Sequence, residues 1–193
     1  PKSPVHRANV AETCGRCHSR RAQLSEDWRP GQSLSNTHMV ALLDRGLYRA
    51  DGQIQEEVYE YGSFLQSRMF AAGVRCSDCH DPHSLRLRAD DNALCTRCHS
   101  ETPNPRFPTL RAKNYDATGH HHHRPGSDGA RCVACHMPTR TYMGVDVRHD
   151  HSLRIPRPDL SGKLGTPNAC NACHADRSPA WAEPLTPVPS TST

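Results

Sequence analysis

Five copies of one short motif constrain this chain more than any other feature of its sequence. All ten cysteines fall into pairs separated by two residues, and a histidine follows each pair directly. Two thiols at this spacing can each form a thioether with a haem vinyl group, and the adjacent imidazole can bind the iron. The sequence therefore predicts five covalently bound haem c groups, one at each of the motifs Cys14/Cys17/His18, Cys76/Cys79/His80, Cys95/Cys98/His99, Cys132/Cys135/His136 and Cys170/Cys173/His174.

Disulfides and zinc are the two alternative uses of such cysteine pairs. Disulfides would explain the pairing, but they would not explain why a histidine follows every pair. Zinc ribbons use cysteine pairs two at a time, and an odd number of pairs cannot all be used in that way. Haem attachment accounts for all fifteen residues of the motifs.

The composition leaves little to build an interior from. Only 35% of the 193 residues are hydrophobic and 5% are aromatic, whereas 16 are proline and 12 are glycine. A chain of this size needs more apolar surface to form its own core, so we expect porphyrins to fill the interior. The predicted fold is mostly irregular and helical, with short helices and loops wrapped around a row of five haems and little or no β-sheet.

Two stretches in the long gap between the first two motifs have helical periodicity. Residues 37–48 carry apolar side chains at Met39, Leu42, Leu43 and Leu47, and residues from about 54 to 72 carry them at Val58, Leu65 and Met69. The short gap at 81–94 should make the second and third haems close neighbours. We predict a pentahaem domain over residues 1–182 and a Pro/Ser/Thr-rich tail over 183–193.

The second axial position of each iron decides between electron conduction and catalysis. A second imidazole leaves no room for substrate, whereas an open position permits chemistry on a small molecule. Nine histidines lie outside the motifs, and they occupy five places in the sequence. We therefore expect histidine at both axial positions throughout, with His6, His38, His83, His122 and His151 as the distal ligands.

Some of these choices depend on local sequence. His83 lies only three residues after His80, too close to reach the far face of the same haem, so it should bind a neighbouring iron. His122 represents the run 120–123, and His151 is preferred to His149 because the proline-rich segment after it can lie extended against a porphyrin. Among the thioether alternatives Met39, Met69, Met137 and Met143, the first two fit a helical core better.

The charge pattern excludes some partners. The net charge is +4, and only Lys2, Lys113 and Lys163 among the 24 cationic residues are lysines. Arginine suits bidentate pairing with carboxylates such as haem propionates. Since no basic stripe is interleaved with aromatic residues, we expect no nucleic acid as a partner. No apolar stretch is long enough to span a membrane.

Haem attachment of this kind takes place outside the bacterial cytoplasmic membrane. We therefore expect an exported protein, periplasmic or extracellular, whose signal peptide has been removed before Pro1. The tail composition also suggests a glycoprotein with O-linked sugar, the candidate positions being Thr186, Ser190, Thr191, Ser192 and Thr193.

Beyond the motifs, residues from about 12 to 182 resemble a bacterial group of multihaem c-type cytochromes whose haem domain is often followed by tetratricopeptide repeats. The resemblance implies that His83 and His151 are distal ligands. The chain departs from that group by stopping soon after Trp181, and in this it is more similar to extracellular cytochromes that polymerise into conductive filaments. The matching stretches are residues 61–67, 73–83, 136–143 and 150–160.

These features predict electron transfer and no enzyme activity. The chain is expected to be the repeating subunit of an extracellular filament, or nanowire, with self-association and other redox cytochromes as its partners. A monomeric periplasmic shuttle is the alternative. A nitrite or hydroxylamine oxidoreductase is a weaker one, because pentahaem nitrite reductases carry one motif ending in lysine and all five motifs here end in histidine.

Overall fold

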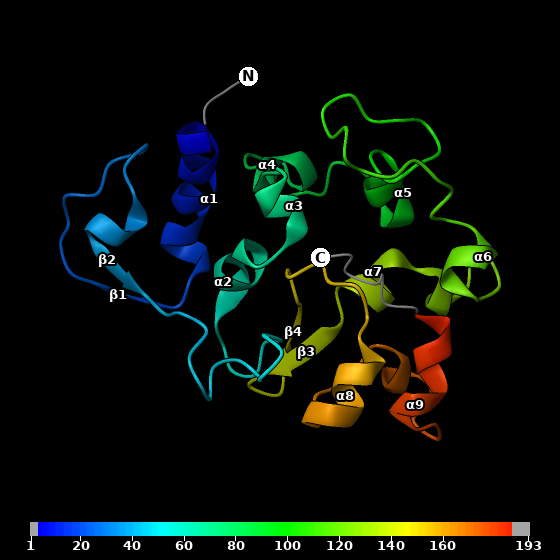
Figure 1. The fold of residues 1–193 in the computed structure, drawn as a ribbon. Coiled ribbons are helices and arrows are strands. Elements are labelled where there is room, and N and C mark those ends of the chain that lie inside the picture. Colours follow the sequence, from blue (N-terminus) through cyan, green and yellow to red (C-terminus); the bar gives the residue numbers. More distant parts are fainter. Residues whose placement is uncertain (1–3, 187–193) are drawn as a thin grey trace, which may run out of the picture.

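The computed structural model describes residues 4–186, with side chains from Val10 onward. The chain forms short helices joined by long loops, and two small sheets of two antiparallel strands each. Figure 1 shows the elements in space. They are α1 (Pro4–His18), β1 (Arg21–Gln23), η1 (Leu34–Asn36), β2 (His38–Val40), α2 (Tyr59–Leu65), α3 (Arg68–Ala71), α4 (Cys76–Cys79), α5 (Asp91–Thr96), α6 (Thr118–His121), η2 (Asp128–Ala130), α7 (Cys132–His136), β3 (Thr139–Tyr142), β4 (Asp146–His149), α8 (Pro158–Leu164), η3 (Cys170–Ala172), α9 (Pro179–Ala182) and η4 (Glu183–Leu185).

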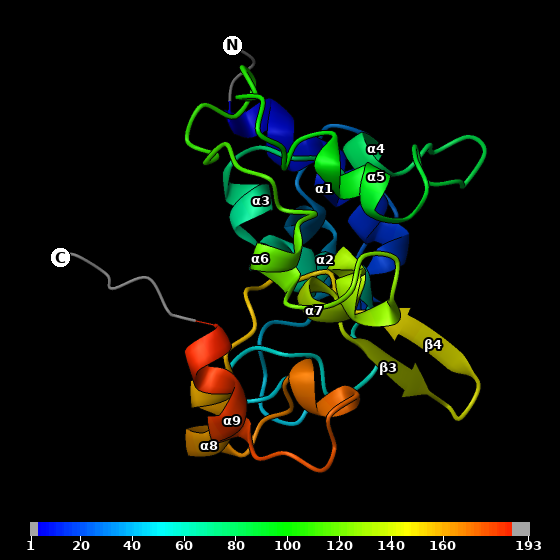
Figure 2. The same ribbon diagram turned by 90° about the vertical axis from the view of Figure 1, so that its right-hand side faces the viewer.

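The predicted fold class is confirmed, since short helices and loops dominate and the sheets are minimal. Strand β1 pairs with β2 so that Ala22 lies opposite Met39, and β3 pairs with β4 so that Arg140 lies opposite Arg148. The β3–β4 hairpin extends away from the helices, as Figure 2 shows. Neither sheet is recognisable in the sequence, because strands of three and four residues are too short to show alternation.

The helix predicted over residues 37–48 is wrong. The segment begins as strand β2 and continues through turns, with Gly46 at a φ of 90°. Its apolar residues do not form a buried face, since Met39, Leu42 and Leu43 are 63%, 74% and 55% exposed. Spacing alone cannot distinguish a helix from a strand and a turn when pairing with β1 satisfies the backbone instead.

The second helical pattern, from about residue 54 to 72, is confirmed in part. It forms two helices, α2 and α3, that are separated at Gln66 and Ser67. The break has a local cause, because the hydroxyl of Ser67 accepts a hydrogen bond from the Phe70 amide at 3.0 Å and so begins a new helix. Phe64 and Phe70 then meet edge to face across the break at 5.6 Å.

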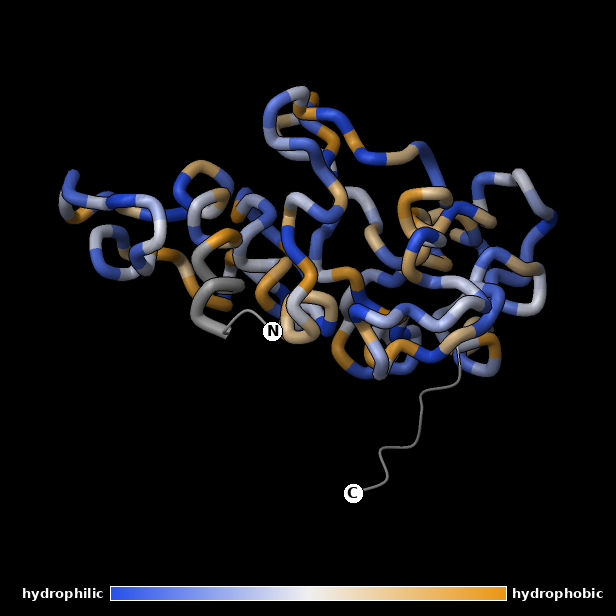
Figure 3. The backbone as a smooth tube through the Cα atoms, turned by 90° about the horizontal axis from the view of Figure 1, so that it is seen from above, coloured by the Kyte–Doolittle hydropathy of each residue, from blue (hydrophilic) through white to orange (hydrophobic). Residues whose placement is uncertain are grey.

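The apolar interior of the described residues is small and divided. Figure 3 shows hydrophobic segments scattered along the backbone between hydrophilic ones. Large side chains such as Leu85 and Val145 are more than 80% exposed. The low content of apolar residues therefore corresponds to a small buried apolar interior. The buried apolar residues are Ala11, Trp28, Leu34, Tyr48, Val58, Phe64, Phe107, Ala130, Tyr142 and Ala182.

The C-terminal boundary stays a prediction. The turn η4 continues the chain past residue 182, and the Thr186 hydroxyl donates to the Ala182 carbonyl at 3.3 Å. Residues 187–193, with the proposed glycosylation positions Ser190, Thr191, Ser192 and Thr193, lie outside the described part of the chain. Among the helices described, none is long and apolar enough to cross a membrane.

Candidate functional site

The five cysteine motifs lie on short helical turns that follow one another through the molecule. The first occupies the end of α1, and the others lie on or beside α4, α5, α7 and η3 (Figure 1). The thiols of Cys14 and Cys76 are within hydrogen-bonding reach, which lowers the pKa of Cys14 and raises that of Cys76. The first and second motifs are thus direct neighbours.

The third and fourth motifs are joined in the same way. The thiols of Cys95 and Cys132 are within hydrogen-bonding reach, which raises the pKa of Cys95 and lowers that of Cys132. The Asn92 side chain connects the two helices, because its carbonyl accepts from the Cys132 amide at 2.8 Å and its amide donates to the Ala130 carbonyl at 2.9 Å. Asn92 is not recognisable from the sequence, because it belongs to no motif and to no periodic pattern.

Electrostatic effects on cysteine pKa values show which of the remaining motifs lie near each other. Burial first, then the charge of Asp78, and then the electrostatic effect of Cys98 raise the pKa of Cys79. Burial and the thiols of Cys170 and Cys173 likewise raise the pKa of Cys135. The motifs therefore follow their order in the chain, and the second and third lie near each other as the short gap between them predicts.

Two motif cysteines, Cys17 and Cys173, are less covered by the chain than the others. Both residues are exposed, whereas the other eight motif cysteines are partly buried. The difference has a positional cause, because Cys17 belongs to the first motif of the row and Cys173 to the last. A motif at either end has a neighbouring motif on one side only, so less of the chain covers its second cysteine. Thioether attachment stays a prediction at all ten motif cysteines.

Three of the five motif histidines face a second histidine. The ring centres of His80 and His151 are 6.3 Å apart, with an angle of 28° between the rings. The other two pairs are His136 with His120, at 6.1 Å and 9°, and His174 with His123, at 6.0 Å and 33°. Two imidazoles that share one metal ion hold it at about 2 Å each, which places their ring centres about 6 Å apart.

Aromatic pairs without a metal also occur at such distances, and hydrogen bonds add which ring nitrogen in each pair is available to a metal. The Nδ1 atom of His136 donates to the Arg154 carbonyl at 2.8 Å, and that of His151 donates to the His149 carbonyl at 2.9 Å. The Nδ1 atom of His123 donates to the His121 carbonyl. A carbonyl can only accept, so the proton lies on Nδ1 and the lone pair on Nε2, as in metal-binding histidines.

The histidine run 120–123 differs from its predicted role. Of the described residues in the run, His120 and His123 face motif histidines, whereas the expected ligand His122 is exposed and has a left-handed backbone with a φ of 60°. Helix α6 ends at His121, and the reversal at His122 turns the chain so that His120 and His123 face two different motifs. Burial, followed by the charge of Lys113, lowers the pKa of His120 to about 4, which keeps that imidazole neutral.

His38 is almost completely buried, at 2% exposure, on strand β2 instead of the expected helix. Its Nδ1 lies 2.9 Å from the Thr37 hydroxyl, and its Nε2 is buried without a hydrogen-bond partner in the described part of the chain. Burial, and then the charges of Arg21 and Arg16, lower its pKa. A neutral imidazole with an unused Nε2 is suited to bind a metal.

The remaining predicted residues have other surroundings. His83 is exposed, and its amide donates to the Asp81 carboxylate at 2.9 Å. The ring of His99 meets Tyr115 edge to face at 5.4 Å, and His18 contacts Glu60 at 3.1 Å. His6 lies in α1, but its side chain is outside the described set.

The second motif is held by an arginine that sequence reasoning also missed. Arg106 donates to both carboxylate oxygens of Asp78, at 2.7 Å each, and the Arg75 amide donates to the same carboxylate at 2.8 Å. Burial alone would raise the pKa of Asp78, but these hydrogen bonds outweigh it and the pKa is lowered. The loop around residue 106 is thereby fixed against α4.

The residues of the motifs fit haem as their cofactor. Each motif offers two thiols beside one imidazole, and three motif imidazoles have a second imidazole at the spacing that one shared iron requires. Among the described residues, no three His, Cys, Asp or Glu side chains converge as the ligands of a protein-only metal site. The donor set thus fits covalently attached haem.

Comparison with known proteins gives two matches. The family of doubled CXXCH motifs matches residues 69–104, which contain the second and third motifs. No curated protein sequence matches the chain. Among solved structures, the crystal structure of the outer cell wall cytochrome OcwA has a similar fold, with a TM-score of 0.62 and 18% sequence identity.

That similarity covers 89% of this chain and 50% of the other, so the chain spans half the length of the protein that it resembles. At this level of identity the comparison shows the fold, and the doubled motif adds the chemistry of haem attachment. Together they support the interpretation of this chain as a multihaem c-type cytochrome.

Proposed function

We propose that this protein conducts electrons along a row of five covalently bound haems, each held between two imidazoles. The observation that carries the proposal is the set of three facing histidine pairs, with ring centres 6.0 to 6.3 Å apart. Haem supplies one-electron exchange between Fe(III) and Fe(II) when bound. The chain supplies the thiols, the axial imidazoles and the spacing between neighbouring sites.

The ligands follow from the geometry of these pairs. We assign His151 to the second motif, His120 to the fourth and His123 to the fifth, so the histidine run provides two ligands instead of one. His6, His38 and His83 remain the candidates for the first and third motifs, and the buried, unused Nε2 of His38 favours it among them. Two axial imidazoles leave no open position for a substrate, which supports a carrier over an enzyme.

The proposal includes the cellular location of the protein. The structurally similar protein is described as an outer cell wall cytochrome, which supports an exported, extracellular or periplasmic location for this chain. We propose that copies associate into a filament that passes electrons between subunits and to other redox cytochromes. A monomeric shuttle would use the same haem sites.

Haem content and ligation test the central proposal. The purified protein should carry the mass of five haems, stain for haem after denaturing electrophoresis, and bind almost no carbon monoxide when reduced. A mass with fewer haems would contradict the row of five. Substantial carbon monoxide binding would contradict double imidazole ligation and would favour a nitrite or hydroxylamine oxidoreductase.

The state of assembly requires a separate measurement. Electron microscopy of the native preparation, with sedimentation at several protein concentrations, distinguishes filaments from monomers. We expect ordered filaments whose length increases with concentration. Monomers at every concentration would leave the shuttle as the function.

A further inference from the structure

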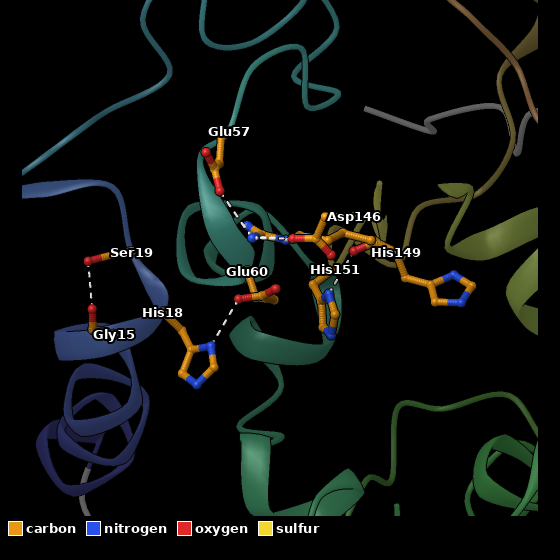
Figure 4. A network of polar contacts seen from close by, with 9 residues as sticks. Gly15, His18, Ser19, Glu57, Glu60, Asp146, His149 and His151 are labelled. Atoms are coloured by element: carbon orange, nitrogen blue, oxygen red, sulfur yellow. Dashed lines mark hydrogen bonds and ion pairs between the residues drawn. The ribbon is translucent and has the colours of Figure 1, made fainter. Parts of the chain in front are cut away.

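Among the motif histidines of the described chain, only His18 contacts a carboxylate. The Nδ1 atom of His18 lies 3.1 Å from a carboxylate oxygen of Glu60, and Figure 4 shows the two side chains pointing toward each other. In the other Nδ1 contacts that involve facing histidines, the acceptor is a neutral backbone carbonyl. Glu60 thus places a full negative charge where His136, His151 and His123 have only a dipole.

The position of Glu60 is built by the contact between α1 and α2. A Cβ atom at Gly15, inside the first motif, would lie 2.7 Å from the ring of Tyr61, so only glycine permits this close approach. The adjacent Ser19 hydroxyl donates to the Gly15 carbonyl at 2.6 Å and fixes the end of α1 (Figure 4). Because Tyr61 is pressed against the motif, Glu60 beside it is presented to His18.

The start of α2 is held from the other side as well. Tyr59 has a left-handed backbone, with a φ of 61°, a conformation that is strained for a non-glycine residue. The Arg148 guanidinium lies 4.8 Å from the Tyr59 ring and contacts Glu57 at 3.0 Å, and it also pairs with Asp146 at 2.5 Å. These contacts connect the β3–β4 hairpin to the residues that begin α2, and they stabilise the backbone that carries Glu60.

A carboxylate acceptor changes the imidazole that it contacts. It draws the Nδ1 proton toward itself and increases the basicity of Nε2, as in the carboxylate–histidine pairs of metal sites. A more basic ligand donates more electron density, which favours Fe(III) over Fe(II) and lowers the reduction potential. Glu60 acts through His18 and is a positioning residue that need not touch the haem.

We propose that Glu60 lowers the reduction potential of the haem at the first motif. The inference rests on the proposed function, since it requires a haem bound through His18. The competing interpretation is a surface ion pair without effect on the iron, because the His18 side chain is 64% exposed and that of Glu60 is 29% exposed.

The substitution Glu60→Gln separates these interpretations in the intact five-haem protein. It keeps the size of the side chain and an oxygen acceptor but removes the charge. Glu56→Gln is the matched control, because Glu56 is an exposed neighbour of the same charge and its carboxylate has no hydrogen bond or ion pair among the described contacts. Spectroscopic redox titration at an electrode, with EPR of the oxidised proteins, gives the readouts.

In Glu60→Gln, one of the five one-electron components should move to higher potential, and the low-spin EPR g-values of one haem should change. At the wild-type midpoint of that component, the Fe(III)/Fe(II) ratio should fall on the order of tenfold, which corresponds to about 59 mV for one electron. Glu56→Gln should match wild type in both measurements.

Superimposable titrations of Glu60→Gln and wild type would overturn the inference, as would an equal shift in Glu56→Gln. Haem content by mass distinguishes this failure from failure of the proposed function. Five haems with unchanged potentials reject only the role of Glu60, whereas a wild-type protein without covalent haem rejects the conducting row itself.

Discussion

At the scale of single residues, each imidazole takes its chemical role from the partner of its Nδ1 atom. A carbonyl partner, as for His136, His151 and His123, places the proton on Nδ1 and leaves Nε2 free to bind a metal. His121 is the reverse case, because its Nδ1 accepts from the His123 amide at 3.1 Å, which leaves the proton on a buried Nε2. His121 and His123 thereby differ in which ring nitrogen carries the proton.

The substitution His120→Ala tests this division of roles. Because His120 faces His136 at 6.1 Å, its removal should open one axial position, so that one haem in five becomes high-spin and binds carbon monoxide when reduced. His122→Ala is the control, since that residue is exposed and should leave the carbon monoxide difference spectrum unchanged. An open site in the control but not in His120→Ala would refute the assignment.

Some of these functional residues can be recognised from the sequence and others cannot. Every motif cysteine and histidine is recognisable from its spacing, because the chemistry of attachment is local. The choice within the histidine run is not, since the left-handed turn at His122 decides which members face His136 and His174. Glu60 and Asn92 could not be found either, because they act across 42 and 40 residues of sequence.

At the scale of elements, local pattern is a weak guide where haem motifs and loops organise the chain. The segment 37–48 has the spacing of a helix, yet its pairing with β1 makes it a strand and a turn. The pattern from 54 to 72 does form helices, but Ser67 divides them in a way that apolar spacing does not reveal. A helix or strand is predictable where hydrogen bonds within its own segment determine its conformation. It is not predictable where pairing with a distant segment determines that conformation.

Docking of α2 on α1 should depend on the missing side chain of Gly15. The substitution Gly15→Ala places a Cβ 2.7 Å from the Tyr61 ring, and we expect it to cost about 1–3 kcal/mol of unfolding free energy by overpacking. Gly162→Ala in α8 is the control, because no atom lies within 4 Å of its added Cβ, and it should be neutral or stabilise by about 0.4–1 kcal/mol. Urea titration measures both, and equal midpoints would contradict the packing argument.

Helix α8 should depend on pH through its first turn. Arg157 donates to both carboxylate oxygens of Asp159, at 2.7 and 2.6 Å, and this lowers the pKa of Asp159 to about 2. A folded-state pKa below the unfolded value of about 4 stabilises the fold above pH 4, and this contribution is lost as the pH falls toward 2.

The thermal midpoint of Asp159→Asn should therefore lie below that of wild type at pH 7, and the difference should close between about pH 4 and pH 2. Asp176→Asn removes an aspartate of a more exposed pair, 3.2 Å from Arg177, and serves as the control. A gap that persists unchanged to pH 2 would show that the carboxylate is not what stabilises the turn.

At the scale of the whole molecule, the described side chains do not form one continuous apolar interior. The buried apolar residues lie in separate groups, such as Ala11 and Leu34 near α1 and Ala182 at the opposite end of the described chain. The five motifs connect these groups, because the cysteines of successive motifs lie close enough to shift one another's pKa. The row of motifs, more than any hydrophobic core, unites the molecule.

This architecture predicts that folding requires haem. When the chain is produced where haem is not attached, we expect circular dichroism without a cooperative thermal transition and rapid proteolysis throughout, because the chain alone buries too little apolar surface to offset its conformational entropy. The exported protein with Cys170→Ser and Cys173→Ser is the control. It should lose one haem, lose protection mainly around η3 and α9, and keep a cooperative transition elsewhere. Cys14 with Cys76 still connects the first and second motifs, Cys95 with Cys132 connects the third and fourth, and Cys79 lies near Cys98 between the second and third. A haem-free chain that unfolds cooperatively would show that the polypeptide alone determines the fold.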